Sequence, residues 1–142
     1  MSIKVFCDGL CNIKKRVGCY AFYVEIDNKI MYTKTGVVTH EMVTNNVCEY
    51  TAVLEAVKHC IEKKYDNVTF FADSNLVIQQ LKGVYKTFDG KMTMFKNEIS
   101  SLIKNRSFAF EWISRNENDL ADKLCKGFYI RNMKRGKVDL NV

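Results

Sequence analysis

Five short runs of the chain consist mainly of apolar, β-branched and aromatic residues, and turn-forming residues bound each run. Runs of this kind are typical of β-strands in globular proteins. The pair Asp27-Asn28 separates the second run from the third and predicts a tight antiparallel connection between them. The pattern therefore predicts strands at residues 3–9, 18–26, 29–38, 68–72 and 108–113.

Between these runs, apolar residues recur every three or four positions, which is the period of an amphipathic α-helix. The pattern predicts helices at residues 46–64, 74–81 and 91–104, and a last helix from about 118 into the 130s. In this order, an antiparallel three-strand meander is joined to parallel crossovers. The expected fold class is α/β, with a mixed five-stranded sheet flanked by helices.

Length and composition favour one domain over residues 1–142, because a chain with 47% hydrophobic residues can bury a substantial core. The basic ending, residues 134–142, is expected to be a loose, disordered tail. No signal peptide or membrane span is visible in the sequence. The six cysteines show no C-x-x-C spacing, so we expect reduced, buried thiols in a cytoplasmic protein. No obligate protein partner is indicated, and we expect a monomer.

Four acidic residues stand where an acid is unexpected. Asp8 and Asp73 each end a predicted strand, and Gly9 after the first of them is expected to turn the chain. If these strands are parallel neighbours, the two acids meet at the carboxyl edge of the sheet, where open α/β folds place their chemistry. Glu49 falls on the apolar stripe of its helix, and Asp122 lies on the flank of the apolar face of the last helix.

Taken singly, each acid has an ordinary explanation as a turn residue, a helix cap or the rim of a helix face. Together they repel one another unless a cation lies between them, even though the chain has a net charge of +6. Oxygen ligands without a suitably spaced His or Cys favour Mg²⁺ or Mn²⁺ over zinc. The positive net charge suits a polyanionic partner, and it would suit an anionic membrane equally well.

Four motifs follow one another along most of the chain, from Val5 to about Lys126. They are Phe6-Cys7-Asp8-Gly9, residues 44–52, residues 73–83 with Tyr85-Lys86, and residues 118–124. In this order they resemble ribonuclease H, type 1, of the ribonuclease H-like superfamily. The resemblance implies a ribonuclease H-like catalytic domain in a shorter form, without a preceding hybrid-binding domain or a basic protrusion. It also selects Asp122 over Asp119, a choice that spacing alone leaves open.

The resemblance implies endonucleolytic hydrolysis of the RNA strand of RNA/DNA hybrids by a two-metal-ion mechanism, leaving 5′-phosphate and 3′-hydroxyl ends. It implies two Mg²⁺ ions as cofactors, with Mn²⁺ as a substitute. Asp8 would bridge both ions, and Asp73 and Asp122 would complete the water-activating site. Glu49 would serve the leaving-group side and sense the ribose 2′-hydroxyl. These four acids are the expected catalytic and metal-binding residues.

The resemblance also implies substrate-binding residues near two predicted helix starts. Asn45 and Asn75 would touch the RNA strand, and Thr44 and Asn46 would touch the phosphate of the DNA strand. The alternative is that Thr44 and Asn45 only cap a helix, which both residue types do well. The remaining expected contacts are Asn12, Lys86 and Arg115.

The sequence departs from the family pattern before the last acid, where many relatives carry a loop histidine. Here Arg115 would substitute, as a cation that attracts phosphate rather than as a proton shuttle. Four alternatives stay open at this point: a superfamily nuclease or resolvase that acts on DNA, a ribonuclease H module of a larger replication machine, a non-catalytic nucleic-acid-binding relative, and an unrelated α/β domain that binds a small ligand.

Overall fold

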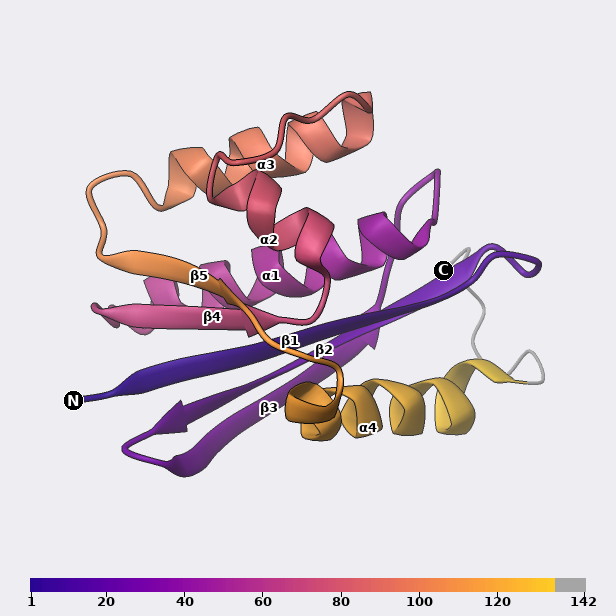
Figure 1. Cartoon of the computed structure of the whole chain (residues 1–142). Coiled ribbons are helices and arrows are strands. Elements are labelled where there is room, and N and C mark those ends of the chain that lie inside the picture. The colour runs from indigo at the N-terminus through magenta and orange to yellow at the C-terminus, as the bar shows by residue number, and fades with distance from the viewer. Residues whose placement is uncertain (135–142) are drawn as a thin grey trace.

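The computed structural model describes residues 1–134, and its five strands form one mixed sheet with helices on both faces (Figure 1). The strands are β1 (Ile3–Asn12), β2 (Val17–Ile26), β3 (Lys29–Val37), β4 (Val68–Ala72) and β5 (Phe108–Trp112). The helices are α1 (Asn45–Glu62), α2 (Asn75–Leu81), α3 (Gly90–Leu102) and α4 (Asp119–Phe128). A 3₁₀ turn, η1 (Asn116–Asn118), precedes α4, and a π-helical turn, η2 (Tyr129–Met133), follows it.

The sheet has the strand order β3-β2-β1-β4-β5. β1 and β2 are antiparallel, as are β2 and β3, while β4 runs parallel to both β1 and β5. The predicted mixed sheet, a meander followed by parallel crossovers, is thus confirmed. The predicted tail at residues 134–142 lies, apart from Lys134, outside the described residues.

The strand β1 is longer than predicted, and Gly9 does not turn the chain. The strand continues to Asn12, with Gly9 opposite Tyr20 of β2. The glycine is required for another reason: a Cβ atom at this position would lie 2.4 Å from the carbonyl carbon of Cys48 in α1. The first turns of α1 therefore pack directly against the backbone of β1.

The parallel register of β1 and β4 brings two of the acids together. Phe6 lies opposite Phe71, and the same register continued by two residues sets Asp8 opposite Asp73. β4 ends at Ala72, so Asp73 stands where this strand leaves the sheet. The expected adjacency of the two acids is observed.

The main core lies between the sheet and the helices α1, α2 and α3, which cover one face (Figure 1). Fully buried residues of this core include Val5, Phe22, Tyr50 and Phe70. The helix α4 covers part of the opposite face over a smaller cluster that consists of Cys19, Ala21, Cys125 and Met133. The sheet is therefore held between two layers, and the acids lie where α1 and α4 approach it.

Five of the six cysteines are buried, as the sequence led us to expect. Among the described helices, none combines the length and the apolar character that a membrane crossing requires.

Candidate active site

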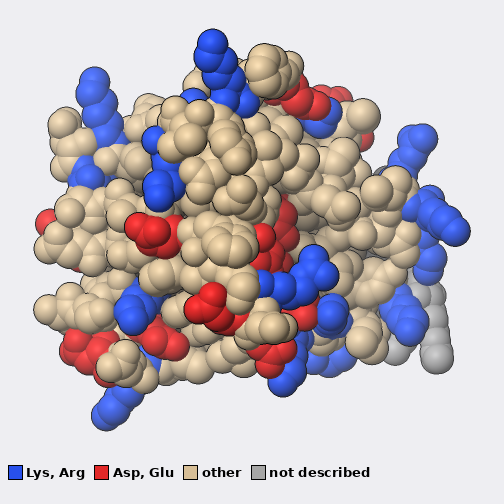
Figure 2. All heavy atoms as spheres, viewed as in Figure 1, with Lys and Arg blue, Asp and Glu red and all other residues tan. Residues whose placement is uncertain are grey.

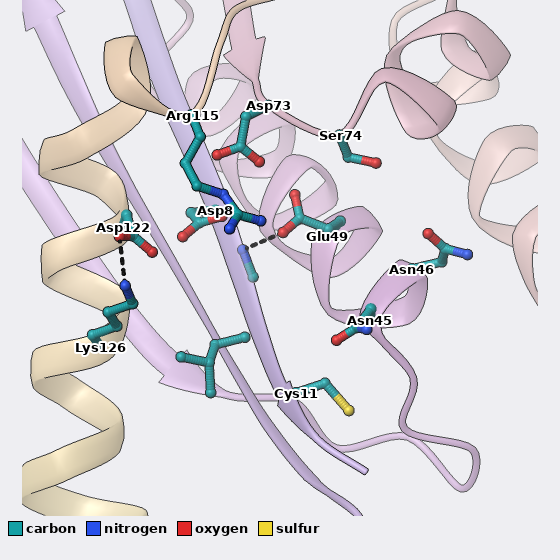
Figure 3. Close-up of a pocket in the computed structure, with 12 residues that line it drawn as sticks. Asp8, Cys11, Asn45, Asn46, Glu49, Asp73, Ser74, Arg115, Asp122 and Lys126 are labelled. Carbon is teal, nitrogen blue, oxygen red and sulfur yellow. Dashed lines mark hydrogen bonds and ion pairs between the residues drawn. The ribbon is translucent and has the colours of Figure 1, made fainter.

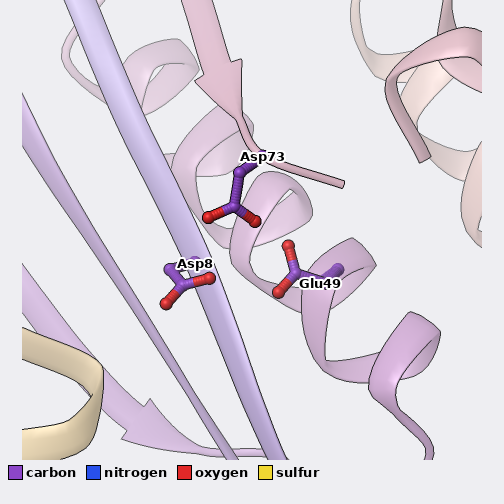
Figure 4. Close-up of side chains that lie close together, drawn as sticks. All are labelled: Asp8, Glu49 and Asp73. Carbon is purple, nitrogen blue, oxygen red and sulfur yellow. The ribbon is translucent and has the colours of Figure 1, made fainter. Parts of the chain in front are cut away.

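Three carboxylates from three different elements meet at the edge of the sheet. Asp8 comes from β1, Glu49 from the second turn of α1, and Asp73 from the end of β4 (Figure 4). One oxygen of each carboxylate lies within 4.8 Å of the others. This spacing lets a single hard cation contact all three groups.

The backbone of β1 holds Glu49 in place. The amide nitrogen of Gly9 donates a hydrogen bond of 3.0 Å to Oε1 of Glu49. The second oxygen, Oε2, is buried and has no hydrogen-bond partner among the described residues. A buried carboxylate oxygen without a partner is costly, and a metal ion would satisfy it. The donor set consists of oxygen atoms and fits Mg²⁺ or Mn²⁺.

The electrostatics of the cluster also favour a cation. Burial, reinforced by the charge of Asp73, raises the pKa of Asp8 to about 7. Burial also raises the pKa of Glu49, and the charges of Asp8 and Asp73 add to that shift. Both shifts mean that the metal-free protein resists full ionisation of the cluster.

The fourth acid, Asp122, lies on the α4 side of the same cavity, whose volume is about 390 Å³ (Figure 3). It is near enough to Asp8 to contribute to the raised pKa of that residue. Its own carboxylate forms an ion pair of 3.0 Å with Nζ of Lys126, one helical turn further along α4. All four predicted acids therefore line one cavity, three in a tight cluster and the fourth on the opposite wall.

Two cationic side chains, Arg115 and Lys126, line the cavity together with the acids. Arg115 follows β5, and its side chain reaches over Asp8 toward Glu49 (Figure 3). In the space-filling view, acidic atoms lie in a hollow near the centre and basic side chains lie beside them (Figure 2). The cavity thus combines groups that attract cations with groups that attract anions. Sequence reasoning selected Arg115 but missed Lys126.

Sequence reasoning also assigned no role to Asn118, which is completely buried at the start of α4. Its Nδ2 donates to the carbonyl oxygen of Cys7 at 2.8 Å and to Oδ2 of Asp73 at 3.5 Å. The indole nitrogen of Trp112 donates to the main-chain oxygen of Asp73 at 3.1 Å. These contacts tie the start of α4 and the end of β5 to the two strands that carry acids. The sequence offered one signal for this role: Asn118 is a polar residue at the beginning of the motif at residues 118–124, directly before the last helix.

The predicted substrate residues at the start of α1 divide into two kinds. Asn45 and Asn46 line the cavity. Thr44 caps α1, with its hydroxyl accepting a hydrogen bond of 3.2 Å from the amide of Val47. The capping role that was weighed for Thr44 is therefore present. The predicted contacts of these residues with nucleic acid stay predictions.

The other predicted substrate residues make contacts outside the acidic cavity. Asn75 is the first residue of α2, and its Oδ1 accepts from Nε2 of Gln79 at 3.2 Å. Lys86 lines a separate, mostly apolar cavity of about 500 Å³. Asn12 is the last residue of β1, and its side chain donates to the hydroxyl of Tyr129 at 2.9 Å. None of these three side chains lines the acidic cavity as the structure describes it.

The sequence model of the family described as "Reverse transcriptase-like" matches residues 6–127. The chain belongs to this family. The match includes all four acids and both cations of the cavity. It therefore covers the complete candidate site of this reverse transcriptase-like protein.

Two relatives show how far the similarity reaches. A ribonuclease H of Campylobacter jejuni is 28% identical over 130 residues, which cover 87% of this chain and 85% of that protein. The uncharacterized protein YpeP of Bacillus subtilis is 31% identical over 87 residues, which cover 58% of this chain but only 38% of that protein.

Solved structures share the fold of this reverse transcriptase-like chain. RNase H1 of Halobacterium salinarum has a TM-score of 0.84 at 20% identity, covering 92% of this chain and 99% of that one. LC11-RNase H1, solved in complex with an RNA/DNA hybrid, has a TM-score of 0.79 at 22% identity, covering 89% of this chain and 95% of that one. The resemblance to ribonuclease H, type 1, is thus confirmed for the fold, and the matched family model spans the four motifs that carry the resemblance.

Proposed function

We propose that this protein is a metal-dependent endoribonuclease that hydrolyses the RNA strand of RNA/DNA hybrids. The observation that carries the proposal is the cluster of Asp8, Glu49 and Asp73, with one oxygen of each within 4.8 Å of the others, in which Oε2 of Glu49 is buried and has no hydrogen-bond partner in the described part of the chain. The name of the Campylobacter jejuni relative and the hybrid bound to LC11-RNase H1 support the choice of substrate.

The proposed cofactors are two Mg²⁺ ions, with Mn²⁺ as a substitute, held by Asp8, Glu49, Asp73 and Asp122. When bound, the ions would activate water and stabilise the leaving 3′-oxygen, so that the products carry 5′-phosphate and 3′-hydroxyl ends. An all-oxygen donor set on four carboxylates supports this assignment.

Other groups of this protein would orient the acids and attract the phosphate of the substrate. The amide of Gly9 holds Oε1 of Glu49, which fixes the orientation of the carboxylate and leaves Oε2 available to a metal ion. Asn118 and Trp112 hold Asp73 from its side chain and its main chain. Arg115 offers its guanidinium at the cavity to the phosphate of the strand being cut.

We further propose that the protein acts as a monomer in the cytoplasm. The free thiols of all six cysteines support a reducing compartment.

The test of substrate class is incubation with an end-labelled RNA/DNA hybrid, with and without Mg²⁺ or Mn²⁺. Single-stranded RNA, double-stranded RNA and duplex DNA serve as controls. We expect cuts within the RNA strand of the hybrid alone, and only in the presence of the metal. Cleavage of duplex DNA instead would favour a DNA-directed nuclease and reject the proposal.

The variants Asp122→Asn and Asp119→Asn form a matched pair on one helix. Both acids lie in the first turn of α4, but Asp119 does not line the cavity. We expect the first change to abolish most of the activity and the second to leave it unchanged. Equal activities of the two variants would reject the assignment of Asp122.

A further inference from the structure

Asp122 differs from the other three acids because it already has a cationic partner. The tight cluster consists of Asp8, Glu49 and Asp73, and Asp122 does not belong to it. Its Oδ2 is instead 3.0 Å from Nζ of Lys126 (Figure 3). Both side chains line the same cavity. In the metal-free protein, an ammonium group therefore offsets the negative charge on the α4 wall.

A divalent ion on this wall competes with that ammonium group. The contact with Lys126 occupies part of the lone-pair capacity of the Asp122 carboxylate, and two cations this close repel each other. The ammonium group is free to move aside, because 59% of the Lys126 side chain and 22% of the Asp122 side chain are exposed. Ion pairs as accessible as this one are weak.

We infer that Lys126 competes with divalent metal for Asp122 and so sets the ion concentration at which the α4 side of the cavity fills. This inference rests on the proposed function, because it takes Asp122 as a metal ligand. Lys126 then acts as a residue that determines metal dependence. It does so through Asp122 and not through contact with the reacting atoms.

A matched ion pair on the same helix provides the control. Lys123 is 2.9 Å from Asp119 with the same four-residue spacing, but 71% and 60% of the two side chains are exposed. Neither residue lines the cavity. Lys123→Met therefore removes one positive charge and one helical ion pair from α4 without changing a contact of the four acids that line the cavity.

The experiment is a calorimetric titration of Mn²⁺ into the parent protein, Lys126→Met, Lys126→Arg and Lys123→Met. We expect Lys126→Met to bind the ion on the α4 side roughly 2- to 5-fold more tightly, which is the range for an accessible ion pair. Lys126→Arg keeps the charge, and Lys123→Met keeps the pair at Asp122, so both variants should bind as the parent does. The Mg²⁺ concentration that gives half-maximal cleavage should fall by the same factor in Lys126→Met.

Two results would overturn the inference: unchanged Mn²⁺ affinity in Lys126→Met, or an equal gain in Lys123→Met, which would reveal only a general charge effect. The titration evaluates Lys126 without any substrate. If the parent protein failed to cut hybrids, the proposed function would fail while the titration still decided the role of Lys126.

Discussion

At the scale of single residues, the four acids that line the cavity were predictable, but the residues that hold them were not. Asp8, Glu49 and Asp73 stand within or beside apolar patterns that a sequence displays directly, whereas the family resemblance was needed to select Asp122 over Asp119. Gly9 was assigned to a turn, whereas it allows α1 to approach β1 and its amide fixes Glu49. Asn118 was given no role, because its contacts with Cys7 and Asp73 depend on which distant segments meet. Lys126 follows Asp122 by four residues on α4, but only the fold shows that both side chains line the cavity.

Replacement of Asp8 by asparagine should stabilise the metal-free protein in a pH-dependent way. The pKa of Asp8 is raised to about 7 in the folded state, against about 3.9 in an unfolded chain, so the folded protein binds more protons between these values. Its stability therefore falls as the pH rises from about 4 to 7, and Asp8→Asn escapes this loss. We expect a gain of roughly 2–4 kcal/mol at pH 8 and little at pH 4.

Urea unfolding in the presence of a chelator, at both pH values, measures this difference. Addition of Mg²⁺ at pH 8 should stabilise the parent more than the variant, because ligand binding adds stability to the folded state that holds the ligand. Equal stability of parent and variant at pH 8 would show that the cluster is not under electrostatic strain.

A methyl group at Gly9 should disrupt the contact between α1 and β1. The added Cβ would lie 2.4 Å from a backbone carbon of α1, and a helix backbone cannot move aside cheaply. We expect Gly9→Ala to cost roughly 2–4 kcal/mol in unfolding free energy. Gly90→Ala is the control, since nothing lies within 4 Å of a Cβ at that position. Denaturant unfolding of both variants provides the comparison, and a neutral Gly9→Ala would refute the close-packing argument.

At the scale of elements, every predicted strand and long helix exists, and the errors lie at their ends. β1 runs three residues past Gly9 because its end pairs with β2, with Asn12 opposite Val17. This hairpin pairing depends on both strands and does not show in the residue pattern of β1 alone. The turns η1 and η2 on either side of α4 were not predicted as separate elements, because their sequences also fit a continuous helix. The shape of η1 matters, since it buries Asn118.

Removal of the Asn118 amide should loosen the start of α4 and disturb Asp73. Asn118→Ala leaves the buried carbonyl oxygen of Cys7 without its donor, at a cost of roughly 1–3 kcal/mol. It also removes the contact to Asp73, so Mn²⁺ binding should weaken. Calorimetric titration and thermal unfolding separate the two effects. Asn116→Ala, at an exposed position of the same turn, is the control. Weaker stability with unchanged Mn²⁺ affinity would limit Asn118 to a structural role.

At the scale of the whole molecule, topology brings together residues that lie far apart along the chain. The parallel crossover sets Asp8 beside Asp73, α1 adds Glu49 from one face of the sheet, and α4 adds Asp122 from the other. The order of the predicted elements allowed us to expect Asp8 and Asp73 at the same edge of the sheet. It could not supply distances, which depend on the packing of α1 and α4 against the sheet.

The net charge of +6 is a property of the whole molecule, and its field attracts a polyanion such as a nucleic acid. Hybrid binding should weaken as salt rises, by roughly 10- to 100-fold between about 50 and 200 mM for two to four phosphate contacts. Fluorescence anisotropy with a labelled hybrid and the Asp73→Asn variant, in Mg²⁺, measures the slope. An affinity independent of salt would mean that phosphate contacts contribute little.

The central claim, that the carboxylate cluster is a metal-dependent nuclease site, is tested most directly by the Mg²⁺ dependence of RNA/DNA hybrid cleavage in the parent protein and Asp73→Asn. The account predicts no cleavage with a chelator, a rate in the parent that rises and saturates with Mg²⁺, and a loss of roughly 100-fold or more in the variant at every concentration. Cleavage by the parent in the presence of the chelator, or equal rates for the two proteins, would contradict it.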